Sequence, residues 1–78
     1  MDDSDRDELF ERLPQRHQRV LNLAADGLSD HEIADAMGEP EDHVRSEVTS
    51  LLTELGFETR TQAILYVIDR TLRQAGKG

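Results

Sequence analysis

The three histidines of the chain are the first candidates for catalysis or metal binding. No serine or cysteine is arranged around His17, His31 or His43 as a nucleophile would be. His43 and Glu47 are four residues apart, so on a helix they could share a metal ion, but two ligands make a weak site. We expect a solvated ion-pair contact there instead, and the same for His31 with Asp35. The sequence therefore predicts no enzyme activity, no metal site and no cofactor.

A helix-turn-helix pattern occupies the middle of the chain. Ser29 and Glu32 form a capping box that begins a helix predicted over Asp30–Met37. A glycine that can adopt the left-handed conformation ends this helix, and a proline suited to a first helical position precedes the next. The second helix is predicted over Glu41–Leu55, because apolar residues recur at intervals of three and four: Val44, Val48, Leu51, Leu52 and Leu55. This order of elements is the helix-turn-helix signature.

Two further helices are predicted on either side of this pattern. Pro14 opens the first, over Gln15–Ala25, without the side-chain hydroxyl that usually caps a helix. The last is predicted over Arg60–Gln74, after a capping box formed by Thr59 and Gln62. No stretch is a credible strand, so the fold class is all-α with four main helices. The expected core includes Ile33, Val44, Val48, Leu51 and Ile64.

Residues 1–12 form an acidic lead, and we place the main domain at residues 13–75. The acids of the lead favour a solvated, partly frayed tail. The alternative is a short extra helix capped by Ser4, which would lay an apolar edge on the domain: Leu9, Phe10 and Leu13.

Four short blocks of sequence occur in a fixed order along the chain: Gly27-Leu28-Ser29, Glu32-Ile33-Ala34, Leu55-Gly56-Phe57 and Arg60-Thr61-Gln62-Ala63. Over roughly residues 13–70 they resemble the LuxR-type (GerE-like) DNA-binding domain, in a single-domain form. Fourth regions of bacterial sigma factors share the Gly-Leu-Ser and Glu-Ile-Ala blocks but lack the closing two, so the LuxR-type interpretation is preferred.

The resemblance implies a transcriptional regulator that binds DNA through the helix-turn-helix. The helix over Glu41–Leu55 would enter the major groove with its N-terminal residues at base edges. Arg45 could bind guanine through two hydrogen bonds, and Glu47 could accept one from cytosine. The DNA-binding residues expected on this basis, including two flanking arginines for phosphate, are His43, Arg45, Ser46, Glu47, Thr49, Arg16 and Arg60.

The last helix has an apolar sector wider than one small core can cover. Generous packing on the first main helix would account for it, and so would a dimer interface. We favour the homodimer, because the last helix of the LuxR-type domain commonly pairs with its twin. The expected interface residues are Leu65, Ile68 and Leu72.

The charge of the chain opposes DNA binding. Seventeen acids against nine bases give a net charge of −8, and the bases include a single lysine, which fits either a GC-rich coding source or adaptation to high salt. Glu39 and Asp42 are expected near phosphates, where they would repel the DNA backbone. An alternative function is therefore an acidic module that binds RNA polymerase, a sigma factor or another regulator instead of DNA.

Composition sets the remaining expectations. The chain has no cysteine, which rules out disulfides and cysteine-ligated metal sites. No apolar run approaches the length of a membrane span, and the acidic N-terminus is unlike a signal peptide. We therefore expect a cytoplasmic protein with no membrane partner.

Overall fold

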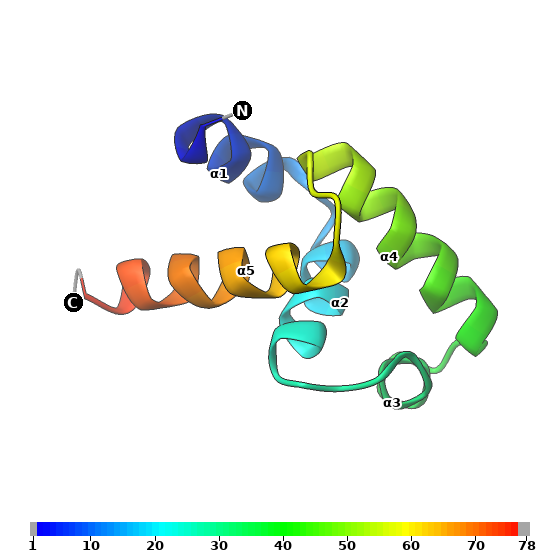
Figure 1. Cartoon of the computed structure of the whole chain (residues 1–78). Helices are drawn as coiled ribbons and strands as arrows, with labels where there is room; N and C mark the ends of the chain where they lie inside the picture. Colours follow the sequence, from blue (N-terminus) through cyan, green and yellow to red (C-terminus); the bar gives the residue numbers. More distant parts are fainter. Residues whose placement is uncertain (1, 77–78) are drawn as a thin grey trace.

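The computed structural model describes residues 2–76, which form five α-helices and no strand (Figure 1). The helices are α1 (Asp3–Arg12), α2 (Gln15–Ala25), α3 (Asp30–Met37), α4 (Glu41–Leu55) and α5 (Arg60–Ala75). The all-α class and the four main helices are confirmed, and α5 ends one residue later than expected. None of the described helices is both long and apolar enough to cross a membrane.

The caps of the helix-turn-helix form as the sequence predicts. The Ser29 hydroxyl accepts from the Glu32 amide at 3.2 Å, and the Glu32 carboxylate accepts from the Ser29 amide at 2.9 Å. Gly38 ends α3 with a φ of 69°, a conformation that favours glycine. The N-terminus of α2, by contrast, receives no side-chain hydrogen bond from Pro14, as expected.

The acidic lead is mostly a helix, so the preferred interpretation of a frayed tail is wrong. The N-cap of α1 is Asp2, whose carboxylate accepts from the amide of Asp5 at 3.0 Å, and not Ser4. Phe10 of α1 is only 2% exposed and belongs to the central core. Arg6 connects α1 to the end of α4, because its Nε donates a hydrogen bond to the Leu55 carbonyl at 3.1 Å.

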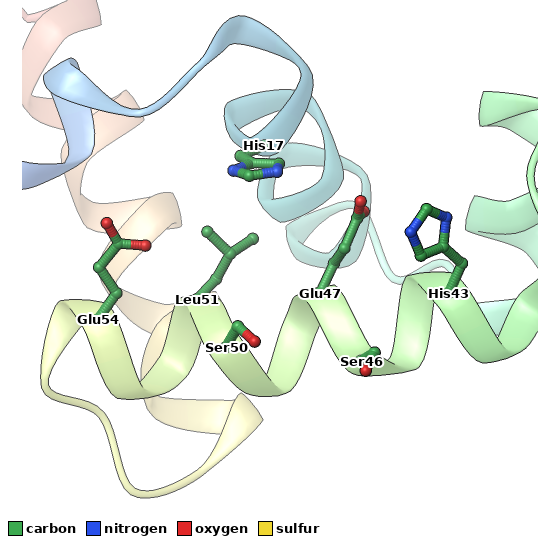
Figure 2. Close-up of a pocket in the computed structure, with 7 residues that line it drawn as sticks. All are labelled: His17, His43, Ser46, Glu47, Ser50, Leu51 and Glu54. Atoms are coloured by element: carbon green, nitrogen blue, oxygen red, sulfur yellow. The ribbon is translucent and has the colours of Figure 1, made fainter.

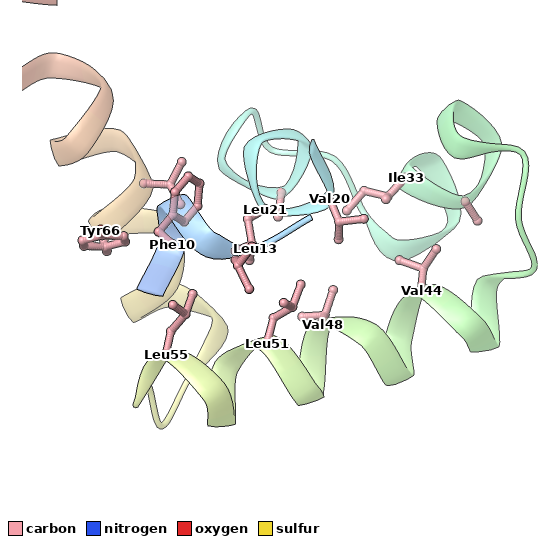
Figure 3. Close-up of a cluster of buried hydrophobic side chains, with 13 residues drawn as sticks. Phe10, Leu13, Val20, Leu21, Ile33, Val44, Val48, Leu51, Leu55 and Tyr66 are labelled. Carbon is pink, nitrogen blue, oxygen red and sulfur yellow. The ribbon is translucent and has the colours of Figure 1, made fainter. Parts of the chain in front are cut away.

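One continuous core joins all five helices (Figure 3). Apolar side chains of α2 and α4 face each other along its length, Ile33 of α3 lies at one end, and Phe10 and Tyr66 lie at the other. Four of the five expected core residues are buried, and Ile64 is partly buried against them. Tyr66 of α5 is also buried, and its ring meets that of Phe10 of α1 edge-on, with the ring centroids 6.1 Å apart.

Asp7 of α1 makes several of the polar contacts between α1 and α5. Its carboxylate accepts two hydrogen bonds from the Arg73 guanidinium, at 3.1 and 3.3 Å, and another from the Tyr66 hydroxyl. The hydrogen bond from Arg73, followed by the one from Tyr66, lowers the pKa of Asp7 below its ordinary value. Burial and the bond to Asp7 raise the pKa of Tyr66, so its hydroxyl remains a donor.

We expect the Asp7→Asn substitution to remove part of the acid sensitivity of the fold. A carboxyl whose pKa is lowered by folding stabilises the native state above its unfolded pKa of about 4, and this contribution disappears as pH falls through the lower folded value. Urea unfolding at pH 7 should show that the variant is less stable than the wild type. Between pH 7 and pH 3 the variant should lose less free energy of unfolding than the wild type does. The exposed Asp5→Asn variant is the control, and equal pH dependence in the wild type and Asp7→Asn would contradict the assignment.

Candidate nucleic-acid interface

The outer face of α4 carries most of the residues expected at DNA bases, but not Glu47, which is only 13% exposed and pairs with Arg16. The apolar stripe of α4 faces the core, which leaves Asp42, Arg45, Ser46 and Thr49 exposed on its other sides. The Thr49 hydroxyl donates to the Arg45 carbonyl at 3.1 Å, so its donor is used within the helix while its oxygen can still accept. The exposed residues lie on the first turns of α4, the part that enters the groove in helix-turn-helix proteins.

Arg45 is surrounded by carboxylates. Its guanidinium nitrogens lie 3.3 Å from Glu41 and 3.4 Å from Asp42 on the same helix, and 3.9 Å from Asp30 at the start of α3. The Arg45 side chain is 60% exposed. Exposed ion pairs of this kind contribute only about 0–1 kcal/mol each. Arg45 can therefore exchange its carboxylate partners for another anion at small cost.

Arg16 connects α2 to α4, and its carboxylate partners hold it more firmly than those of Arg45 do. It donates to both carboxylate oxygens of Glu47, at 2.6 and 3.3 Å, and pairs with Glu39 in the turn before α4. The side chains of Glu39 and Glu47 are only 17% and 13% exposed. Two carboxylates on one guanidinium with little access to water make this a bridge between elements.

Arg60 connects the first turn of α5 to the start of α3. It pairs with the Asp30 carboxylate and donates to the Leu28 carbonyl at 3.1 Å. Asp30 is thus shared between Arg60 and Arg45, and it brings these two expected DNA-binding residues to one place. Arg16 lies in a separate group with His43 and Glu47.

The sequence did not identify Asp30 and Glu39 as the carboxylates that hold these arginines. Glu39, expected to face phosphate, is turned inward onto Arg16 and His43. Asp42, by contrast, is 93% exposed, and its position relative to DNA phosphates stays a prediction. The spacing of Arg45 from Glu41 and Asp42 did signal helical ion pairs. The pairs that connect different helices leave no such signal in the sequence.

The histidines make surface contacts. His31 lies 3.5 Å from Asp35, as expected, and His43 lies 3.4 Å from Glu39, although Glu47 was the expected partner. A shallow pocket of about 280 Å³ runs along α4 beside them (Figure 2). His17 of α2 faces this pocket from the opposite side, and the lining of α4 consists of His43, Ser46, Glu47, Ser50, Leu51 and Glu54.

A second surface lies on α5. Within residues 2–76, the exposed large apolar side chains are Leu65, Ile68 and Leu72, at 61%, 40% and 66%. Spacings of three and four residues place all of them on one stripe of the helix. Tyr66, Arg70 and Arg73 contact α1 from another side of α5, so α1 leaves the apolar stripe uncovered.

The comparisons with known proteins agree with this arrangement. The model of the bacterial regulatory proteins of the luxR family matches residues 11–67, which includes the helix-turn-helix. The chain is 38% identical over 69 residues to the "Response regulator protein VraR" of Staphylococcus aureus, Staphylococcus epidermidis and Staphylococcus saprophyticus. The match covers 88% of this chain but 33% of each relative, so the chain spans about a third of their length. Because the family match covers most of the chain and the capped α3–turn–α4 unit lies within it, the chain belongs to the luxR family of bacterial regulatory proteins.

Proposed function

We propose that this DNA-binding helix-turn-helix domain regulates transcription in the cytoplasm by inserting the first turns of α4 into the major groove. The observation that supports this most directly is the family match across the whole helix-turn-helix. The exposed polar residues of α4 are its candidate base contacts, with Arg45 suited to guanine and Ser46 and Thr49 to several bases. His43 lies at the edge of the same surface.

Arg16 and Arg60 reach phosphate in this proposal by exchanging one anion for another. A phosphate offers the oxygens that Glu47 and Glu39 now give Arg16, and that Asp30 gives Arg60. The exchange leaves carboxylates without partners near the DNA, and Glu47 keeps its capacity to accept from cytosine. We therefore expect weak non-specific binding that depends steeply on salt.

Fluorescence anisotropy of the protein with duplex DNA, at low and high salt, tests the proposal. Random-sequence duplex should bind at low salt and dissociate as salt rises, because counterion release supplies most of the non-specific affinity. A complete lack of binding at low salt would contradict DNA recognition by this chain.

Arg45→Ala should weaken DNA binding by about 1–3 kcal/mol, or about 5- to 150-fold, and relax the preference at one base position. The physical reason is the loss of the exposed cation on the first turns of α4. The measurement is anisotropy against a set of duplexes that differ at single positions.

Arg12→Ala is the matched control, since Arg12 is also exposed, also pairs with a glutamate on its own helix, and lies on α1. Both variants remove one positive charge. Equal losses in the two variants would show that only net charge matters and that α4 does not read bases.

A second candidate function is binding of a basic protein surface through α4. The observation that favours it is that Arg16, Arg45 and Arg60 all contact carboxylates, so the acidic side chains of this face dominate its charge. Suitable partners are RNA polymerase, a sigma factor or another regulator. This function predicts a lack of DNA binding even at low salt, together with salt-sensitive binding to the partner.

We also propose that the chain forms a homodimer through the stripe of Leu65, Ile68 and Leu72. Such an interface would be isologous, with each α5 meeting its copy across a two-fold axis. A dimer would present two copies of α4, and a palindromic DNA site requires them about one helical turn apart. The exposed apolar stripe supports this arrangement.

A further inference from the structure

Three potential metal ligands converge beside the N-terminal half of α4. Glu39, His43 and Glu47 each offer a ligand atom, and these atoms all lie within 4.8 Å of one another. The residues are four apart, so His43 and Glu47 lie one turn from each other on α4, and Glu39 joins them from the preceding turn. Figure 2 shows His43 and Glu47 side by side on the same side of the helix, both directed toward α2.

Little access to water makes the two carboxylates of this group unusual among the acids of the chain. The side chains of Glu39 and Glu47 are 17% and 13% exposed, and Oε2 of Glu39 is buried against the Arg16 guanidinium. Their negative charges are balanced by the single guanidinium of Arg16, which pairs with both. The two carboxylates and Arg16 together carry a net charge of −1. Because the carboxylates are shielded from water, this charge should strongly attract a second cation.

The donor set identifies the class of cation. One imidazole nitrogen and two carboxylate oxygens suit Zn²⁺ and neighbouring divalent transition ions, with water as a fourth ligand. Mg²⁺ and Ca²⁺ prefer sites made entirely of oxygen ligands. We propose that Glu39, His43 and Glu47 form a binding site for a divalent transition-metal ion, and that the ion competes with Arg16 for the two carboxylates.

The surroundings allow this exchange. The pocket of about 280 Å³ beside α4 includes His43 and Glu47 in its lining and gives an ion access from solvent. Arg16 is 37% exposed and can swing into solvent when it leaves the carboxylates. Metal binding would then replace one positive charge by two at this site and free the guanidinium of Arg16.

Titration of the untagged protein with Zn²⁺ by isothermal calorimetry tests the site, with no DNA present. We expect one ion per chain in the wild type, unaffected by an excess of Mg²⁺. His43→Ala and Glu47→Gln should each weaken binding by about tenfold or more. His43 is 59% exposed, so its variant keeps the fold, and circular dichroism would verify this for both variants.

Two further variants separate this site from general attraction of metal to an acidic protein. Arg16→Gln should tighten Zn²⁺ binding by about tenfold, because the ion no longer displaces a charged hydrogen-bond donor. His31→Ala is the matched control, since His31 is also exposed and also lies near two carboxylates, Asp35 and Glu41. Binding without one-to-one stoichiometry, equal losses in His31→Ala and His43→Ala, or an unchanged affinity in Arg16→Gln would each overturn the proposal.

Discussion

Phe10→Ala should lower the free energy of unfolding by about 3–5 kcal/mol, a large part of the stability of so small a domain. The Phe10 side chain is 2% exposed and lies in the core at the end where α1, α4 and α5 meet. One side of its ring contacts Tyr66, and the guanidinium of Arg70 lies 4.5 Å from the ring centroid. Truncation would therefore leave a cavity and also unpack α1 from the domain.

Chemical denaturation of wild type and variant measures this effect. Leu72→Ala is the control, at a protein concentration too low for the proposed dimer, because it also removes a large apolar side chain, but one that is 66% exposed in the single chain. We expect the control to change stability by no more than about 0.5 kcal/mol. If Phe10→Ala lowered the free energy of unfolding by no more than the control does, α1 would not be part of the folded core.

The contrast between α1 and the other helices shows what local sequence can predict. The starts of α3 and α5 were predicted because Ser29 and Thr59 each begin a capping box whose partner is three residues away. α1 has few apolar residues among many acids, so its pattern does not distinguish a helix from a solvated tail. What decides its structure is the contact of Phe10 with Tyr66, which is distant in sequence.

The same limit applies to the candidate interface. The pairing of Arg45 with Glu41 and Asp42 follows from helical spacing and could be predicted. The partners of Arg16 and Arg60 come from other elements and depend on how the helices pack. The sequence singled out these arginines as candidates but did not show that all of them already have anionic partners.

This pairing changes how the net charge of −8 should be interpreted. Arg16 and Arg60 hold helices together through carboxylates, and a phosphate or a metal ion that replaced one partner would alter both the charge and the packing at that point. Arg45 differs, because its partners lie mainly on its own helix and its ion pairs are exposed. For that reason we expect Arg45 to exchange its carboxylate partners for DNA more readily than Arg16 or Arg60 does.

Leu65→Asp should weaken the proposed dimer by at least about 100-fold. Full removal of a leucine side chain from water is worth about 1.5–3 kcal/mol, and an isologous interface contains two copies of each residue. Leu65 is 61% exposed in the single chain, so more than half of this burial would come from dimerisation. Light scattering or sedimentation across a concentration series measures the change in dissociation constant.

The salt dependence of this dimer should be opposite to that of DNA binding. Two chains of charge −8 repel each other at low ionic strength, and salt screens the repulsion, so the dimer fraction should rise as salt is added. Asn22→Asp is the control, since it adds the same charge at an exposed position on α2 that is not part of the stripe, and it should leave the dimer largely intact. A wild type that stays monomeric at high salt and near-millimolar concentration would exclude the α5 stripe as a dimer interface.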